Sequence, residues 1–320
     1  MIPRAVLLGL MLLVSLVGAI TLCARQRVRS AVAAVAALDP RSFKTLSLVV
    51  VGSGGAHENP ERRGPCIAVG FGPRIVLVDA GRAAAEGLRA AGIPVDQPDT
   101  VYLTSLLPEN ALGLDDVLLT GWLAPRKRPL RLIGPEGTRE FAASLERAYA
   151  RGAGALAEGL ALPPEGGRFE VLEIGDGFSE ERDGLTVRAA LLPGGPLPAL
   201  AYRAEAGGRA AVISGTGFGD EAVVGLARGA AVLVHEALHR PSLDAAIEAG
   251  GEEGERLRRE GELHTSLETV GVLANRAGVR TLVLVRLRPP PLFAWQFQHA
   301  VGASFGGEVI VASDGDEITR

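Results

Sequence analysis

The segment His235–His239 reads His-Glu-Ala-Leu-His, a spacing that on a helix brings two imidazoles together to bind zinc, with the glutamate as base. The segment follows the apolar run Ala230–Val234, which is typical of a buried strand, and Pro241 stands two residues after the second histidine. Because proline disfavours a helix through the residue before it, the mid-helix setting that this chemistry needs is missing. The sequence therefore predicts a strand here and no zincin-type site.

Two other segments match reactive motifs only in their letters. Gly302–Gly306 has the G-x-S-x-G pattern, but Ser304 follows a helical pattern, precedes a strand and has no histidine after it. A nucleophile elbow needs a strand, a turn, a helix and then a later histidine. Val49–Pro60 carries a strand into glycines, as a dinucleotide site would, but its prolines prevent the required helix. We predict a tight turn at the second segment and no chemistry at either.

The loop Ser105–Asn110 follows an apolar strand and precedes a helix, a common place for an active site, yet it holds no histidine or cysteine. Glu109, Asn110, Asp115 and Asp116 offer the oxygen ligands that hard cations prefer. Asp115 and Asp116 fall in the early helix and cannot both face the loop, so a new cation site is not favoured.

The chain carries a net charge of −4, with no clustering of its basic residues that would mark a nucleic-acid surface. We expect no nucleic-acid partner. Pro125–Arg131 is predicted to be a solvated loop. Cys23 and Cys66 form no C-x-x-C pattern and are not expected to pair. His57 and His299 are given no role.

The segment Ala5–Cys23 contains no charged residue and approaches the ~20 residues that cross a bilayer. It exceeds a usual signal-peptide core and lacks a nearby A-x-A cleavage site. We predict a membrane anchor over residues 1–24, a linker over 25–45 and one domain over 46–320, with a cleaved signal as the alternative. The arginines that follow the segment favour a cytoplasmic domain.

Apolar runs separated by turn signals give the order strand-strand-strand-helix, which the second half of the chain repeats. This order predicts two sheets packed face to face with helices on both outer faces, an αββα sandwich. Gly152–Gly167 is predicted to be a surface excursion. The expected strands are Leu46–Val51, Cys66–Phe71, Arg74–Asp79, Thr100–Thr104, Leu130–Ile133, Phe169–Ile174, Leu185–Leu192, Ala199–Ala204, Ala210–Ser214, Ala231–His235, Thr281–Val285 and Glu308–Ala312. The expected helices are Arg82–Ala91, Leu112–Leu123, Thr138–Ala150, Glu221–Ala227, Leu267–Ala277 and Phe293–Ala300.

Seven segments in this order resemble the metallo-β-lactamase superfamily, and most closely its ribonuclease Z and arylsulfatase-like branch with an N-terminal membrane segment. The resemblance covers Leu46 to the C-terminus and implies the same αββα sandwich. Because the membrane-anchored relatives generally place the domain outside the cytoplasm, we expect an extracytoplasmic, periplasmic domain. The segments are VGSGGAHENPERRGPCIAV, IVLVDAG, TVYLTSLLPENALGLDDVL, PALAYRAE, RAAVISGTG, GAAVLVHEA and HTSLETVGVLANRAGVRTLVLVRLRPP.

In this family the loop after the strand Thr100–Thr104 reads T-H-x-H-x-D-H and helps to hold two zinc-type ions. The resemblance implies that the ligand positions here form a vestigial pocket of Ser105, Leu107, Glu109, Asn110, Gly195, Thr216 and Arg286. Leucine and glycine side chains supply no lone pair, and arginine brings a permanent positive charge. Without a metal, water keeps its ordinary pKa of about 15.7. We therefore expect no metal and no cofactor.

Some residues of the family are retained. His235 and Glu236 match an H-E-A-T segment, and His264 matches the histidine of an H-S-T-like segment that is thought to assist proton transfer in the nuclease relatives. The favoured interpretation is that these residues hold loops by hydrogen bonds. The alternative is that His264 and Glu109 still perform acid-base chemistry. Glu109, His235 and His264 are thus vestigial candidates, and no catalytic residue is assigned.

These expectations describe a membrane-anchored pseudoenzyme with a non-catalytic binding or scaffold role, although its enzymatic status stays open. One alternative is a metal-dependent or rebuilt-site hydrolase of the phosphodiesterase or esterase type. Another is a sensor in which Arg286 meets a small anionic ligand. The sequence names no protein partner.

Overall fold

The computed structural model describes residues 3–57, 59–124, 126–215, 217, 220–290 and 293–319. It forms two compact units, Met1–Leu38 and Asp39–Arg320. The first unit consists mainly of α1 (Arg4–Val35), so the first part of the expected linker is helical. Within α1, Gly9–Ala31 is long and apolar enough to cross a membrane, with a mean hydropathy of 1.6, although a signal sequence passes the same test.

The second unit contains two sheets, each of which is part antiparallel and part parallel. The first has the order β14-β1-β2-β3-β4-β5-β6, in which β1 runs antiparallel to both β14 and β2, and β3 to β6 are parallel. Its strands are β1 (Phe43–Gly52), β2 (Cys66–Gly72), β3 (Arg74–Val78), β4 (Thr100–Tyr102), β5 (Leu130–Gly134), β6 (Phe169–Glu173) and β14 (Glu317–Thr319).

The second sheet has the order β13-β12-β11-β10-β9-β8-β7, in which β10 to β13 are parallel and β7 to β10 antiparallel. Its strands are β7 (Ser179–Arg182), β8 (Leu185–Leu192), β9 (Ala199–Ala206), β10 (Arg209–Ile213), β11 (Val232–Leu238), β12 (Thr281–Arg288) and β13 (Glu308–Val311). The two sheets thus repeat one topology, as the order of predicted elements indicated.

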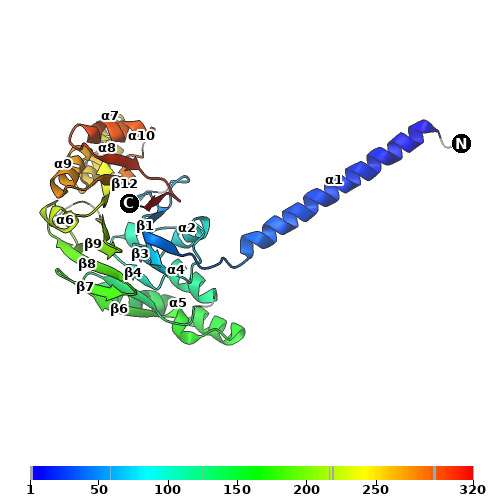
Figure 1. Ribbon diagram of the computed structural model, residues 1–320, viewed down its shortest axis with the longest axis horizontal. Coiled ribbons are helices and arrows are strands. Elements are labelled where there is room, and N and C mark those ends of the chain that lie inside the picture. The colour runs from blue at the N-terminus through cyan, green and yellow to red at the C-terminus, as the bar shows by residue number, and fades with distance from the viewer. Residues whose placement is uncertain are drawn as a thin grey trace. The chain divides into compact units, whose positions relative to one another are not determined.

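Helices α2, α4 and α5 cover the outer face of the first sheet, and α6, α9 and α10 cover the outer face of the second (Figure 1). One buried apolar cluster lies between the sheets, where the rings of Tyr102 and Tyr202 are 5.2 Å apart. A second cluster packs α6, α9 and α10 on the second sheet, and a third packs α2 and α4 on the first. The αββα prediction is therefore confirmed. The helices are α2 (Ala84–Ala90), α3 (Pro108–Ala111), α4 (Leu114–Leu123), α5 (Thr138–Leu160), α6 (Asp220–Ala227), α7 (Arg240–Ala249), α8 (Glu252–Gly261), α9 (Leu267–Ala277) and α10 (Ala294–Gly302).

Two predictions that concern helices differ from the structure. Helix α5 continues to Leu160 and is followed by a 3-10 turn at Pro164–Gly167, so the expected excursion over Gly152–Gly167 is largely helical. Helix α7 was not expected, because Pro241 was taken as a break. Pro241 instead lies in the first turn of α7, where no backbone N–H is needed for the helix ladder.

The strand prediction for the His-Glu-Ala-Leu-His segment is confirmed, because β11 runs through Leu238. The segment Gly302–Gly306 follows α10 and precedes β13, as expected, and Ser304 donates its hydroxyl hydrogen bond to backbone carbonyls of Glu268 and Val301. The predicted tight turn after β1 is instead a loop that runs to Cys66, closed by a hydrogen bond from the Gly54 N–H to the Arg63 carbonyl.

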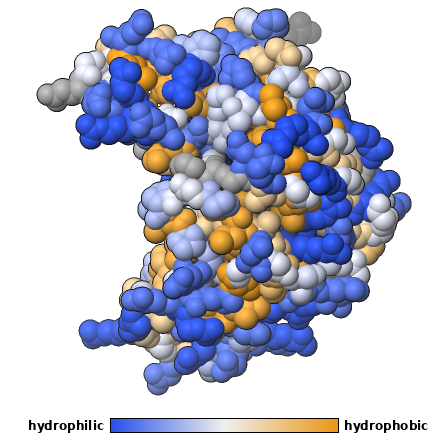
Figure 2. Space-filling view, turned by 90° about the vertical axis from the view of Figure 1, so that its left-hand side faces the viewer, coloured by the Kyte–Doolittle hydropathy of each residue, from blue (hydrophilic) through white to orange (hydrophobic). Residues whose placement is uncertain are grey.

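The surface of one face is shown in Figure 2, where hydrophilic residues cover most of the upper and lower parts and hydrophobic residues show between them. Single exposed apolar side chains are normal on a protein surface.

Candidate active site

Arg286 stands at the centre of the site, on β12 of the second sheet. Its guanidinium donates a hydrogen bond of 2.8 Å to the Asn110 side-chain oxygen and another to the Asp79 carboxylate, and lies 4.0 Å from Glu109. The side chain is buried, and the backbone has a φ of 50°, which L-residues rarely adopt. A cation from the second sheet is thus enclosed by polar groups from the first.

Asp79 follows β3 and accepts hydrogen bonds from Thr104 as well as from Arg286. The Thr104 N–H donates at 2.8 Å and its hydroxyl at 2.9 Å. Burial raises the pKa of Asp79, while Arg286 and the bonds from Thr104 lower it. Asn110 donates to the Ser105 hydroxyl at 2.8 Å. These polar groups of the loop are therefore engaged with one another and with Arg286.

Arg288 connects Glu109 to the other half of the site. Its Nη2 donates to Glu109 at 2.6 Å, while Nη1 lies 3.4 Å from Glu236 and Nε lies 3.5 Å from Glu260. Burial alone would raise the pKa of Glu109, but Arg288 and Arg286 outweigh it and hold the pKa below its ordinary value. Glu109 is therefore an ionised partner of an arginine.

Glu236 and His264 form a buried carboxylate–imidazole pair. The His264 Nδ1 lies 2.7 Å from Glu236, which also accepts the N–H groups of Gly217 at 2.5 Å and Thr265 at 3.2 Å. Burial opposes the charge, but His264 and Arg288 outweigh it and lower the pKa of Glu236 to about 2. Since the carboxylate can only accept, Nδ1 carries the hydrogen, and Nε2 is left as the nitrogen that can exchange a proton.

His235 does not join this pair as a reacting group. It is buried, its Nδ1 lies 2.8 Å from the Glu236 carbonyl oxygen, and burial lowers its pKa. A neutral, enclosed imidazole with a backbone partner supports the strand. The interpretation that it holds local structure agrees with these contacts.

A cavity of about 490 Å³ opens over these residues. Its lining includes the predicted pocket residues Ser105, Leu107, Glu109 and Gly195, together with His264. Asn110 and Arg286 do not border it, and the predicted Thr216 lies outside the described residues. Arg286 is thus placed behind Glu109 and not where it would meet a small anion in this cavity.

The residues at the family's ligand positions do not fit a two-ion centre. The described positions supply Ser, Leu, Glu, Asn, Gly and Arg, and the Glu109 carboxylate is already paired with a guanidinium. In the part of the chain that the structure describes, no three His, Cys, Asp or Glu side chains come together so as to hold a metal ion.

The oxygen ligands weighed for a new cation site are also separated. Glu109 and Asn110 bond to arginines, whereas Asp115 accepts the hydroxyl hydrogen bond of Tyr149. Asp116 accepts a 2.7 Å bond from Thr120 on its own helix. The four oxygen-bearing side chains thus each bond to a different partner.

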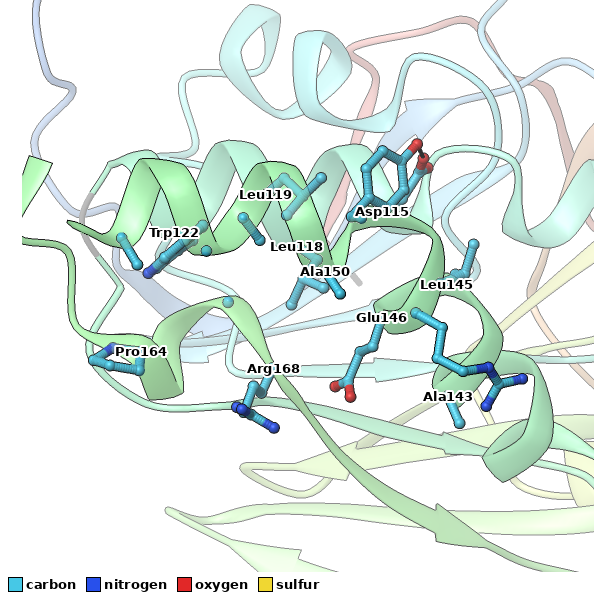
Figure 3. A pocket seen from close by; sticks show the side chains of 16 residues that line it. Asp115, Leu118, Leu119, Trp122, Ala143, Leu145, Glu146, Ala150, Pro164 and Arg168 are labelled. Carbon is cyan, nitrogen blue, oxygen red and sulfur yellow. Dashed lines mark hydrogen bonds between the residues drawn. The ribbon is translucent and has the colours of Figure 1, made fainter. Parts of the chain in front are cut away.

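Another cavity, of about 430 Å³, lies between α4 and α5 (Figure 3). Trp122 and Leu118 of α4 face Ala150 and Glu146 of α5 there. The Trp122 N–H donates to the Pro163 carbonyl at 2.7 Å, and Glu146 accepts the Phe169 N–H at 2.7 Å. Because these polar groups form hydrogen bonds to the protein's own backbone, we assign this cavity a structural role.

Sequence reasoning missed Arg288, Glu260 and the pairing role of Asp79. Arg286 and Arg288 are two residues apart on one strand, so they are spaced as side chains on the same face of a sheet are. Asp79 directly follows the buried strand β3. These signals could have singled out the residues, but their partners lie far away in the sequence.

No family model matches the chain. Ribonuclease Z of Mycobacterium marinum is 30% identical over 278 residues, which cover 84% of this chain and 96% of that protein. Ribonuclease Z of Mycobacterium sp. (strain KMS) is 32% identical over 251 residues, covering 77% of this chain and 85% of that protein.

Solved structures share the fold at low identity. The metallo-β-lactamase fold protein YhfI of Bacillus subtilis has a TM-score of 0.64 at 16% identity, covering 86% of this chain and 99% of that one. The short form of human tRNase Z has a TM-score of 0.61 at 20% identity, with 85% and 98% covered. Zn²⁺-bound PqqB of Methylobacterium extorquens has a TM-score of 0.56 at 17% identity, with 86% and 100% covered.

These relatives contradict two expectations from the sequence. The predicted non-catalytic scaffold is wrong, because the similar chains are ribonuclease Z enzymes over most of their length. The prediction of no cofactor is also contradicted, by the ribonuclease Z relatives together with PqqB, a neighbour of the same fold that is Zn²⁺-bound. Both expectations gave most weight to the lost ligands and took the retained Glu236 and His264 as residues that hold loops, whereas His264 of this pair borders the cavity.

A match to enzymes over most of both chains, on a shared αββα framework, settles the family. The chain belongs to the ribonuclease Z family of metallo-β-lactamase-fold proteins.

Proposed function

We propose that this chain is a hydrolase of phosphodiester bonds whose proton transfer depends on His264. The observation that carries this proposal is the His264–Glu236 pair, which is buried on the Glu236 side and borders the 490 Å³ cavity on the His264 side. The relatives named ribonuclease Z act in the same reaction class.

Glu236 is a positioning residue in this proposal. Its three fixed hydrogen bonds hold the carboxylate, and the carboxylate in turn holds the imidazole in one tautomer. His264 Nε2 accepts a proton from the attacking water and later returns it to the leaving oxygen. A new P–O bond forms to the water oxygen while the P–O bond to the leaving group breaks, so that the products are a phosphomonoester and an alcohol.

Arg288 supplies positive charge beside His264, since both border the cavity. A guanidinium matches the geometry of phosphate oxygens and stays charged at any working pH. Glu109 orients Arg288 through its 2.6 Å hydrogen bond. Arg286 does not border the cavity, and it holds Asn110 and Asp79 in place by hydrogen bonds.

The test is turnover by the purified full chain in lipid nanodiscs. Substrates are bis(p-nitrophenyl) phosphate, a single-stranded RNA and p-nitrophenyl acetate, each assayed with EDTA, with Zn²⁺ and with Mn²⁺, so that activity is detected whatever the metal requirement. We expect phosphodiester turnover, and a loss of about 10²–10⁴-fold in His264→Gln. His299→Gln is the matched control, because that histidine is exposed on α10.

Two results contradict the proposal. One is that neither phosphodiester is turned over under any condition. The other is that His264→Gln and His299→Gln retain equal activity while both remain folded by circular dichroism.

We also propose that α1 anchors the domain to a membrane and that the domain is extracytoplasmic. The length and composition of Gly9–Ala31 support the anchor. Fractionation of cells that express the full chain tests the anchor, and alkaline phosphatase fused after Arg320 tests the orientation. Soluble protein, or a fusion that is inactive while a matching cytoplasmic reporter is active, argues against the respective part.

A further inference from the structure

A second cavity, of about 330 Å³, adjoins the one described above. The two cavities share residues at their boundary, which are Ala56, His57, Arg256, Glu260, His264 and Arg288. The reacting groups His264 and Arg288 therefore border both spaces. A substrate whose scissile bond lies at His264 would place one substituent in each cavity.

The boundary consists largely of side chains that are paired with one another. His57 Nε2 lies 2.7 Å from Glu260, while Arg256 and Arg288 each lie 3.5 Å from the same carboxylate. His57 is about half exposed. Because long side chains change rotamer far more easily than backbone moves, a ligand can extend between the two cavities without a change in the fold.

The remaining walls of the second cavity are mainly apolar. The carbon-rich part comes from β11, α7, α8 and β12, and is made of Leu238, Leu243, Ala246, Leu257, Leu287 and Pro289. A volume of this size lies within the range of cavities that hold small ligands. Burial of alkyl groups against such walls is favourable in proportion to the apolar area removed from water.

The outer cavity adds exposed leucines around the same reacting groups. Leu112 is 59% exposed, Leu263 is 45% exposed and Leu197 is 42% exposed, and all three line this cavity. Exposed leucine side chains beside His264 and Arg288 favour a ligand that has alkyl groups.

The linings of both cavities are unlike a site for single-stranded RNA. Such sites stack bases on aromatic rings and follow the backbone with a basic groove. Of the described residues that line the two cavities, none is Phe, Tyr or Trp.

We propose that the substrate is an amphiphilic phosphodiester, in which one ester substituent is an alkyl or acyl chain that occupies the 330 Å³ cavity beside His264. This proposal rests on the hydrolase function above and names its substrate class. The phosphate lies at Arg288 and His264, and the chain extends toward α7. Hydrolysis attaches the water oxygen to phosphorus and releases the other substituent as an alcohol.

The experiment measures how chain length affects turnover. Full-length protein in nanodiscs is assayed with p-nitrophenyl alkyl phosphates that carry ethyl, butyl or octyl groups. We expect kcat/KM to rise about tenfold or more from ethyl to octyl. Ala246→Phe fills the cavity and is expected to remove this rise.

Ala245→Phe is the matched control, because Ala245 is an exposed neighbour on α7 that does not line the cavity. It is expected to keep the chain-length dependence. Leu257→Trp fills the same cavity from α8 and replaces Ala246→Phe if that variant does not fold. A wild-type protein without chain-length dependence, an unchanged dependence in the filled variant, or faster cleavage of RNA than of the octyl substrate overturns the proposal.

A binding measurement separates this proposal from the proposed function. Calorimetry with octylphosphonate, which is not hydrolysed, is expected to show binding that is lost in Ala246→Phe and kept in Ala245→Phe. If that pattern appears without turnover of any phosphodiester, the hydrolase proposal fails and the ligand class stands. If short phosphodiesters are turned over and the phosphonate does not bind, the proposed ligand class fails and the hydrolase proposal stands.

Discussion

The guanidinium of Arg286 on β12 donates a hydrogen bond to the carboxylate of Asp79 at the end of β3, and so joins the two sheets across the site. Both side chains are almost fully buried. Each therefore depends on the other for compensation of its charge, since an unpaired buried charge is costly.

Asp79→Asn is expected to destabilise the domain by about 3–5 kcal/mol, because Arg286 would keep its buried charge and lose its ionised partner. Chemical denaturation followed by fluorescence measures the free energy of unfolding. Glu221→Gln is the control, since its pair with Arg276 is exposed and solvent screening leaves such pairs little effect on stability. Equal stability of the two variants would contradict the expectation. The double variant Asp79→Leu/Arg286→Met should recover much of the loss.

Arg288→Lys is expected to lower kcat of phosphodiester hydrolysis by more than about tenfold, because an ammonium cannot reproduce the planar fork that bonds Glu109 and faces the cavity. Steady-state kinetics with bis(p-nitrophenyl) phosphate measure this effect. Arg259→Lys is the comparison, since Arg259 lines the outer cavity but is largely exposed and pairs with Glu255. If both lysine variants lose activity to the same degree, Arg288 has no special role.

The stability of the domain is expected to fall as the pH is lowered from about 7 to about 5, and His235 is one cause. Burial lowers the pKa of His235 below its ordinary 6.5, so the unfolded chain binds a proton in this range that the folded chain does not. The contribution of His235 to the free energy of unfolding is fully present above pH 6.5 and is lost as the pH falls below 6.5. His235→Gln should flatten the pH dependence, whereas His299→Gln should leave it unchanged. Denaturation midpoints at several pH values provide the measurement.

Gly81→Ala is expected to destabilise the domain by about 1–3 kcal/mol, the usual cost of overpacking. A Cβ at Gly81 would lie 2.5 Å from the backbone of Gly64 and Pro65, which cannot move like a flexible side chain. Gly225→Ala is the control, because nothing lies within 4 Å of its Cβ position in α6. That helical substitution should be neutral or stabilising by up to about 1 kcal/mol. Thermal unfolding of the two variants distinguishes the outcomes.

Much of the framework could be predicted because its strands carry continuous or alternating apolar residues. Leu185–Leu192 and Leu267–Ala277 were expected with the bounds that the structure has. Helix α8 was missed because its sequence is almost wholly polar and depends on Glu–Arg pairs along its own surface. Strand β7 is Ser-Glu-Glu-Arg and owes its place to pairing with β8, which no local pattern records.

The candidate site was predicted in its position but not in its chemistry. The alignment of the loop after β4 placed Ser105 and Glu109 at the cavity. It could not show that Glu109 bonds Arg288, because those residues are far apart in the chain and meet only when the sheets pack. The inference from missing ligands to a missing activity is contradicted by the ribonuclease Z relatives, and in the proposed function proton transfer depends on separate residues, His264 and Glu236.

The pairing across the sheets also restricts how this lineage can change. A mutation that introduced histidine at position 286 would remove the cation that Asp79 and Asn110 now contact, while the neighbouring leucine and glycine positions would still lack donor atoms. Such an intermediate would have neither the ion pair nor a metal site. A ligand set like that of the family would therefore require several coordinated substitutions, and the arginine arrangement is expected to persist among the descendants of this chain.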